Sequence, residues 1–281
     1  METILKVENL TKVFSRKGQP DFTAVNHIGF EMGPGECLGL IGESGSGKST
    51  TVNMITRLLD VTEGSIVLDG MDITNVSGRE LRRVYAGMQM VFQTPTDSFD
   101  PRRTLGDGIG ESLRNNGWSR KDTKDEVARL LEVCGLSPDF ASRYPHQVSG
   151  GQCQRAAIAR ALAIRPKLLI CDEATSALDV TIQQEIIALL SDLRWTKGTD
   201  LSILFICHDI ALVQQFCSRV LVMYKGDIVE QGDPNVIIRN PKDPYTKRLI
   251  DSILRMIPDH TDSMYETAAA DRPQAIRIVR V

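Results

Sequence analysis

A glycine-rich run between two predicted regular elements constrains this chain more than any other feature. Residues 42–50 fit the pattern G-x-x-x-x-G-K-[ST] of phosphate-binding loops. The apolar run 37–41 before it predicts a buried strand, and residues 48–59 predict a helix. This order of strand, loop and helix indicates an α/β fold. The run consists of Gly42, Glu43, Ser44, Gly45, Ser46, Gly47, Lys48, Ser49 and Thr50.

The residue types in this loop suit a phosphate group. Glycines let the backbone turn tightly and point its N–H groups inward, and the N-terminus of the next helix adds partial positive charge. We expect Lys48 to neutralise the β- and γ-phosphates of a nucleotide, and the Ser49 hydroxyl to bind Mg²⁺. The loop therefore predicts a site for a nucleotide with its magnesium ion.

Charge and hydropathy argue against several classes of protein. The 281 residues carry a net charge of −3, which disfavours a nucleic-acid-binding protein with a globally basic surface. No window approaches the roughly 20 apolar residues that span a bilayer, and the first ten residues do not resemble a signal peptide. The six cysteines show no C-x-x-C spacing, which favours reduced thiols in the core of a cytosolic protein.

Strand-like and helix-like segments alternate along the chain around a mainly helical insertion. Between residues 94 and about 165, prolines separate helical segments. There, Thr123 and Glu126 fit a capping box, and an apolar helix face follows. That face consists of Val127, Leu130, Leu131 and Cys134. Strands are predicted at 65–68, 88–92, 168–171 and 201–207, and a hairpin at 220–224 with 227–231.

Two adjacent carboxylates end one of these predicted strands. Residues 168–171 are apolar, and Asp172 and Glu173 follow them. At a strand end near the phosphate-binding loop, Asp172 would help to hold Mg²⁺. Glu173 would orient and deprotonate a water molecule for attack on the γ-phosphate. Acidic pairs are common at strand ends, so this interpretation depends on the other motifs.

A third motif indicates the family. Val148, Ser149, Gly150, Gly151 and Gln152 precede an alanine-rich helical stretch. They resemble the LSGGQ signature of ATP-binding cassette (ABC) ATPases, with valine in place of the first leucine. Ser149 and the two glycines would form a second helix N-terminus that attracts an anion. The resemblance implies a head-to-tail dimer in which each ATP lies between one subunit's phosphate-binding loop and the other's signature.

Further elements of that family follow in the expected order. The resemblance implies that Gln93 contacts Mg²⁺ or the attacking water, and that His208 touches the γ-phosphate. It implies that Phe14 stacks on adenine. Residues 176–179, with the sequence Ser-Ala-Leu-Asp, match the family's D-loop. The resemblance implies that this segment, including Asp179, crosses the dimer interface.

The same resemblance implies the architecture. We expect an α/β fold with a P-loop NTPase core of the RecA type, an N-terminal antiparallel β subdomain and a helical signature-motif subdomain. The ABC ATPase domain is expected over residues 1–257, with its helical subdomain at about 94–165. Residues 258–281 are expected to form an extension to which no fold is assigned.

Two segments resemble one branch of the family, the importers of dipeptides, oligopeptides and nickel. Residues 98–102 resemble its S-L-N-P-R segment, although Phe99 and Asp100 depart from that pattern. Residues 242–249 resemble its H-P-Y-T-x-x-L segment. Some members carry a C-terminal cysteine cluster for an iron–sulfur centre, but the last cysteine here is Cys217.

This branch implies a set of partners. We expect a second ABC ATPase subunit, with a heterodimer favoured over a homodimer, two transmembrane permease subunits and an extracytoplasmic solute-binding protein. No nucleic acid is expected as a partner. The chain would lie peripherally on the cytoplasmic face of the cell membrane, and residues 94–107 would receive the permease.

Import of di- or oligopeptides is the main hypothesis, and import of nickel or a metal–chelate complex is the alternative within the same machinery. A DNA-maintenance ATPase would carry long coiled coils between loop and signature, and the 101 positions from Lys48 to Ser149 leave no room for them. A ribosome-acting protein would normally carry two cassettes. A non-hydrolysing subunit is disfavoured because Lys48, Asp172, Glu173 and His208 are all present.

Overall fold

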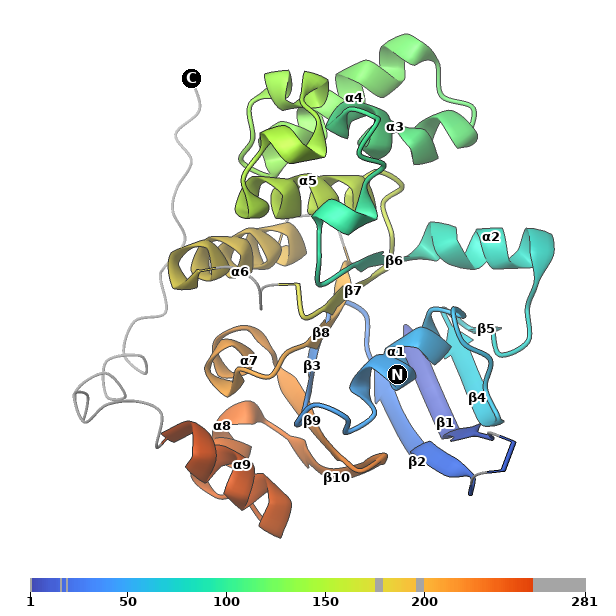
Figure 1. Ribbon diagram of the computed structural model, residues 1–281, viewed down its shortest axis with the longest axis vertical. Helices are drawn as coiled ribbons and strands as arrows, with labels where there is room; N and C mark the ends of the chain where they lie inside the picture. The colour runs from blue at the N-terminus through green and yellow to red at the C-terminus, as the bar shows by residue number, and fades with distance from the viewer. Residues whose placement is uncertain (1, 16, 19, 175–178, 196–199, 255–281) are drawn as a thin grey trace.

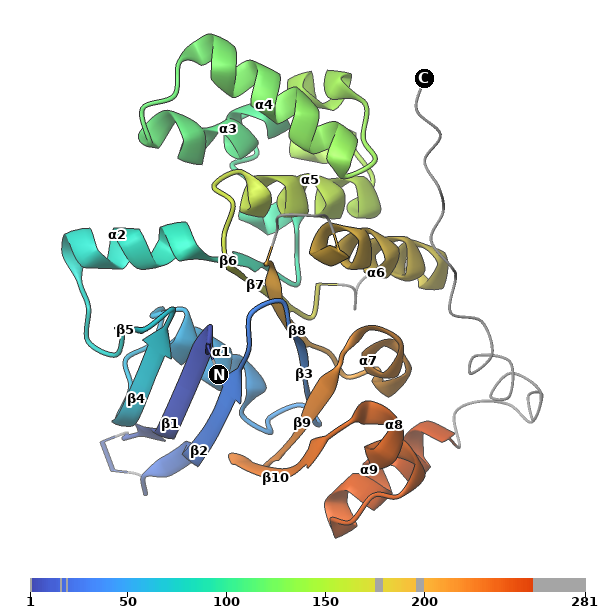
Figure 2. The same ribbon diagram turned by 180° about the vertical axis from the view of Figure 1, so that it is seen from behind.

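The computed structural model describes residues 2–15, 17–18, 20–174, 179–195 and 200–254 (Figures 1 and 2). The predicted extension 258–281 and residues 176–178 of the predicted interface segment lie outside this part of the chain. The described elements form two β-sheets, a layer of helices above them, and further helices between the sheets and beside the central sheet. Within the described residues, no helix is both long enough and apolar enough to cross a membrane.

The central sheet has the strand order β10-β9-β3-β8-β7-β6. All neighbours pair in parallel except β9 and β10, which form the predicted hairpin. Parallel strands are covered on both faces, which explains their continuous apolar runs. The strands are β3 (Cys37–Ile41), β6 (Met88–Val91), β7 (Leu168–Asp172), β8 (Ser202–Ile206), β9 (Arg219–Tyr224) and β10 (Asp227–Gly232).

A smaller antiparallel sheet comes from the N-terminal part of the chain. Its order is β2-β1-β4-β5. The strands are β1 (Leu5–Phe14), β2 (Phe22–Met32), β4 (Glu63–Leu68) and β5 (Met71–Asp72). This sheet is the antiparallel β part expected from the resemblance to ABC ATPases.

Two hydrophobic cores lie on the two faces of the central sheet, because successive side chains of a strand point to opposite faces. In β3, Leu38 and Leu40 pack with α1 (Lys48–Ile55) and the antiparallel sheet. Cys37 and Ile41 belong instead to the core under the helices. Helix α1 thus lies between the two sheets, as both views show (Figures 1 and 2).

Every regular element between residues 94 and 165 is helical, in agreement with the mainly helical insertion that the sequence predicts. Helices α3, α4 and α5 stack above the central sheet in both views (Figures 1 and 2). These elements are η1 (Thr96–Ser98), α3 (Leu105–Asn115), α4 (Arg120–Val133), η2 (Pro138–Ser142), η3 (Pro145–Gln147) and α5 (Gly150–Leu162). The other helices are α2 (Gly78–Gly87), α6 (Val180–Trp195), α7 (Ile210–Phe216), α8 (Pro234–Arg239) and α9 (Pro244–Leu254).

Two predicted helix boundaries are wrong. The helix predicted at 48–59 ends at Ile55, because the chain turns out of helical geometry at Arg57, whose φ is 59°. Helix α4 begins one turn before the predicted cap: the Ser119 hydroxyl accepts the N–H of Asp122 at 3.1 Å. The predicted cap residue, Thr123, is a buried side chain inside the helix. The predicted apolar face of α4 is confirmed as buried.

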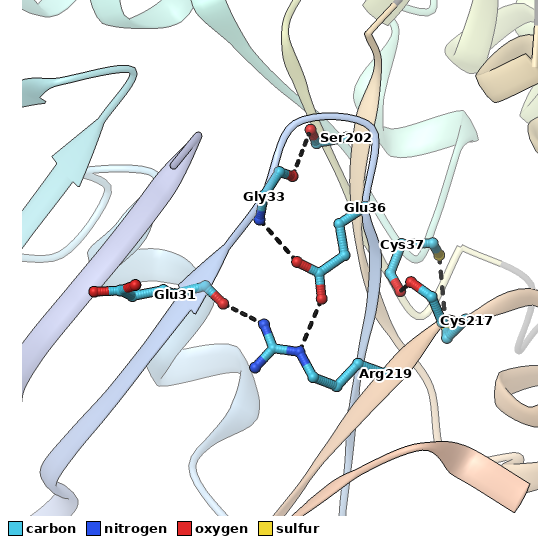
Figure 3. Close-up of polar contacts among 8 residues, drawn as sticks. Glu31, Gly33, Glu36, Cys37, Ser202, Cys217 and Arg219 are labelled. Carbon is cyan, nitrogen blue, oxygen red and sulfur yellow. Dashed lines mark hydrogen bonds and ion pairs between the residues drawn. The ribbon is translucent and has the colours of Figure 1, made fainter. Parts of the chain in front are cut away.

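A clasp of polar groups joins the two sheets at the amino ends of β3 and β9 (Figure 3). The Glu36 carboxylate accepts the Gly33 N–H and the Arg219 Nε–H, both at 2.8 Å. The Arg219 guanidinium also donates to the Glu31 carbonyl. Ser202 at the start of β8 donates from its hydroxyl to the Gly33 carbonyl at 3.3 Å. These contacts hold the turn from β2 into β3, and so orient the strand that leads to the phosphate-binding loop.

The cysteines lie in the core, as predicted. All six are free and buried. The Cys37 and Cys217 sulfurs lie 3.5 Å apart beside the clasp (Figure 3). Burial raises the pKa of the Cys153 thiol to about 11 and that of Cys207 to about 12, so both stay protonated at neutral pH.

Candidate functional site

The phosphate-binding loop, residues 42–47, links β3 to α1 as predicted. Three of its glycines have positive φ: 151° at Gly42, 80° at Gly45 and 111° at Gly47. A Cβ on Gly47 would lie 2.6 Å from the Ala24 carbonyl oxygen, so only glycine fits there. Ser44 and Gly45 at the middle of the loop and Ser49 in the first turn of α1 are exposed, which leaves the mouth of the loop open.

Lys48 lies against this loop. Its ammonium group donates to the Gly42 carbonyl at 2.6 Å and to the Glu43 carbonyl at 2.9 Å, and the residue is 5% exposed. Burial lowers the pKa of Lys48, while the negative charges of Glu173 and Asp172 oppose that shift. The amine is therefore a positive charge held beside the loop backbone and coupled to two carboxylates.

The carboxyl ends of four neighbouring parallel strands bring the predicted catalytic side chains to one edge of the sheet. The loop follows β3, His208 follows β8, Asp172 ends β7 and Gln93 follows β6. Ligands of open α/β sheets bind outside this edge. Residues spread over more than 160 positions of sequence thus lie beside one loop. We call this edge of the sheet, formed by the carboxyl ends of the four strands, the catalytic edge.

Glu173 and Gln93 contact each other at this edge. The Gln93 side-chain amide donates to the Glu173 carboxylate at 2.9 Å. The Glu173 backbone N–H donates to the Ile206 carbonyl of β8 at 3.0 Å, and its φ is 47°, an uncommon value for a non-glycine residue. A side-chain amide thus holds the Glu173 carboxylate, a suitable arrangement for a base that must be oriented.

Asp172 suits a magnesium ion. Its Oδ1 atom is buried and has no hydrogen-bond partner among the described residues. Burial raises the pKa of the Asp172 carboxyl, the charge of Glu173 raises it further, and Lys48 opposes the rise. Among the described residues, no group of three His, Cys, Asp or Glu side chains could hold a metal. An ion there would keep waters and phosphate oxygens as ligands beside Asp172 and Ser49, as Mg²⁺ usually does.

The other predicted residues are Phe14, Asp179 and His208, of which His208 follows β8 at the catalytic edge. Phe14 ends β1 and is 38% exposed, with the Lys12 ammonium 5.3 Å from its ring centre. The exposed ring is available for stacking. Asp179 caps α6, because its carboxylate accepts the Ile182 N–H at 3.0 Å. His208 is exposed.

The signature turn, residues 148–152, begins α5 in the helical layer. The Ser149 hydroxyl accepts the Gln152 N–H at 3.3 Å, and the Gln152 side chain accepts the Ser149 N–H at 3.0 Å. This reciprocal capping box orders the turn locally. In both views α5 lies in the layer above the sheets, whereas α1 lies between them (Figures 1 and 2).

Two contacts that sequence reasoning missed hold the phosphate-binding loop from the C-terminal part of the chain. The Glu43 N–H donates to the Tyr245 hydroxyl at 2.9 Å. The Gly226 N–H, in the turn between β9 and β10, donates to the Ser46 carbonyl at 2.9 Å. Tyr245 belongs to the Pro-Tyr-Thr segment, residues 244–246, within the stretch 242–249 that resembles one branch of the family. No local pattern in the sequence shows that this tyrosine contacts a loop about 200 residues earlier.

Comparison with protein-family models finds a match to the ABC transporter model over residues 25–176, more than half of the chain. The glutathione import ATP-binding protein GsiA of Shigella dysenteriae is 44% identical over 284 aligned residues, which cover 99% of this chain. GsiA of Escherichia coli is 43% identical over 284 aligned residues, which also cover 99% of this chain. The chain spans about 45% of the length of these relatives.

Solved structures agree with this match. The dimeric ATP-binding cassette MJ0796, in a post-hydrolysis state bound to ADP and Pi, has a TM-score of 0.74 and 29% identity, and the match covers 82% of this chain and 98% of that one. CbiO1 of Clostridium perfringens, part of the ABC transporter complex cbiONQ, has a TM-score of 0.76 and 27% identity. That match covers 92% of this chain and 97% of the other.

Proposed function

Because this chain belongs to the ABC transporter family, as an ATPase that hydrolyses ATP for transport, we propose that it powers the uptake of small peptides through partner permeases. The observation that carries the proposal is the catalytic edge. There Lys48, Asp172 and the Gln93–Glu173 pair surround the mouth of one phosphate-binding loop.

In this proposal the residues divide the chemistry of hydrolysis. Gln93 and Glu173 hold a water in line with the γ-phosphate, and Glu173 takes its proton as the oxygen–phosphorus bond forms. The bond from phosphorus to the ADP oxygen breaks, and Lys48 neutralises the charge that develops there. His208 contacts the γ-phosphate from β8. A magnesium ion held by Asp172 and Ser49 would neutralise phosphate charge. Phe14 stacks on the adenine ring.

The second part of the proposal is that the site is completed by another cassette. The signature turn lies in the helical layer rather than against the chain's own loop (Figure 1). The matched cassette MJ0796 is a dimer in its solved structures. We propose that Ser149, Gly150, Gly151 and Gln152 face the ATP of a second subunit, with Asp179 at the interface. A different ATPase chain is the favoured partner, and a second copy is the alternative.

The cargo and the membrane partners are also proposals. Identity of 43–44% to proteins named for glutathione import favours a small peptide over nickel. The chain would lie on the cytoplasmic face of the membrane beneath two permeases, which a solute-binding protein serves from outside. Residues 94–107, at the entry to the helical layer, would contact the permease.

The first test is affinity purification of the tagged chain from mildly solubilised membranes of its host. We expect two permeases, a second cassette and a solute-binding protein in the eluate. Recovery of ribosomes or DNA-repair proteins without a permease would contradict the transport proposal.

The second test addresses the cargo. ATP turnover of the purified complex in liposomes is measured with its binding protein and either glutathione, an unrelated tripeptide or Ni²⁺. Stimulation by a peptide supports the proposal. Stimulation by Ni²⁺ alone would instead support the metal importer.

A further inference from the structure

Tyr245 joins the C-terminal helix α9 to the start of the phosphate-binding loop. Its hydroxyl accepts the Glu43 N–H at 2.9 Å across 202 positions of sequence. The carbonyl of the same residue, Glu43, accepts the Lys48 ammonium at 2.9 Å. One tyrosine thus fixes the backbone of the residue that contacts the phosphate-binding lysine.

The tyrosine itself is held firmly. Asp243 caps the first turn of α9 by accepting the Tyr245 N–H at 2.7 Å. The Glu230 carboxylate of β10 accepts the N–H groups of Lys242 and Asp243 at 2.9 and 3.1 Å. The residue is 4% exposed, and its ring stacks on Tyr224 with centroids 4.0 Å apart. The hydroxyl therefore has a fixed position relative to β9 and β10.

The loop needs such an anchor near its start. A Cβ on Gly42 would overlap the Met223 carbonyl, so the loop leaves β3 in close contact with β9. At Glu43 the chain turns out toward solvent, and the side chain there is exposed. A backbone N–H that is held before the ligand arrives does not have to be ordered on binding, and such preorganisation raises affinity.

We propose that Tyr245 is a positioning residue for ATP, which holds the entry of the phosphate-binding loop in the conformation that accepts the phosphates. The inference rests on the proposed nucleotide site and extends that site to α9. It assigns the Pro-Tyr-Thr segment a role in binding ATP.

The test compares Tyr245→Phe with Tyr224→Phe in the full chain. The first change removes the hydroxyl that contacts the loop, and the second removes a hydroxyl from the stacked ring beside it. ATP affinity is measured by equilibrium titration, and the melting temperature is measured in parallel. Loss of one hydrogen bond predicts about two- to tenfold weaker ATP binding for Tyr245→Phe and no change for Tyr224→Phe. In the assembled complex, the KM for ATP should rise by a similar factor while kcat stays within about twofold.

The outcomes separate this inference from the ATP site itself. Unchanged affinity in Tyr245→Phe beside normal binding by the wild-type chain would overturn the role of Tyr245 alone. Equal weakening in both variants would overturn it as well, because ring packing would then be the cause. A wild-type chain that binds no ATP would overturn both proposals.

Discussion

The phosphate-binding loop and the signature turn are both glycine-containing helix starts, but they are held in different ways. The loop is held by distant parts of the chain, through Tyr245 and Gly226. The signature turn is ordered locally by the capping box of Ser149 and Gln152. It also approaches α6 closely at Gly151, where a Cβ would lie 2.6 Å from a methyl carbon of Ile182.

The difference fits two roles. A loop that must surround a phosphate in its own subunit needs a fixed backbone, and the central sheet and α9 supply it. A turn that offers its N–H groups to a partner's nucleotide needs only local order and an exposed position. Ser149 and Gly150 are exposed, whereas Gly42 is buried.

The largest expected effect separates chemistry from binding at the catalytic edge. Glu173→Gln keeps the shape of the side chain but removes the base, so we expect turnover of the assembled complex to fall about 10²- to 10⁴-fold. ATP affinity should stay close to that of the wild type. ATPase assays and equilibrium titration measure the two quantities. Near-normal turnover would contradict the assignment of Glu173 as the base.

Lys48→Ala tests the anchored loop directly. The variant removes a buried ammonium group that the β- and γ-phosphates would bind. Charge-assisted hydrogen bonds contribute about 1.5–3 kcal/mol each, so ATP should bind roughly 10- to 100-fold more weakly. The same titration with Lys124→Ala, an exposed lysine of α4 in the helical layer, is the control. Equal affinity in Lys48→Ala and the wild type would refute the phosphate-binding role.

Paired glycine substitutions sharpen the contrast between the two helix starts. Gly42→Ala combines a φ of 151° with overlap of the Met223 carbonyl, so we expect a loss of about 1–3 kcal/mol in unfolding free energy. Gly151→Ala meets only the side chain of Ile182, which can move, and should cost about 1 kcal/mol or less. Denaturant unfolding of both variants measures the difference. A larger loss at Gly151 would reverse the comparison.

Ser149→Ala tests the capping box of the signature turn, with a small expected effect on stability. Loss of the N-cap should lower the free energy of unfolding by about 1 kcal/mol. ATP affinity of the separate chain should not change, because the turn serves the partner's nucleotide. Turnover of the assembled complex should fall. Weaker ATP binding by the separate Ser149→Ala chain would show that the turn acts on its own subunit's site.

Much of the fold could be predicted because its signals are local. The strand predicted at 37–41 coincides with β3, and the hairpin at 220–224 with 227–231 matches β9 and β10 within one residue. Apolar runs bounded by glycine and polar residues carry this information. Helix ends were predicted less well: Ser119 rather than Thr123 caps α4, since both residues offer a hydroxyl and only tertiary packing buries one of them.

The sequence by itself determined the phosphate-binding loop, the strand-terminal carboxylates and the signature, because each depends on residue types at fixed local spacing. Only the tertiary structure decided what holds them. The order of strands β3, β8, β7 and β6 places Gln93 against Glu173, and the packing of α9 places Tyr245 against Glu43. Contacts between residues 80 and 202 positions apart leave no periodic trace in a sequence, because they arise from the packing of whole elements.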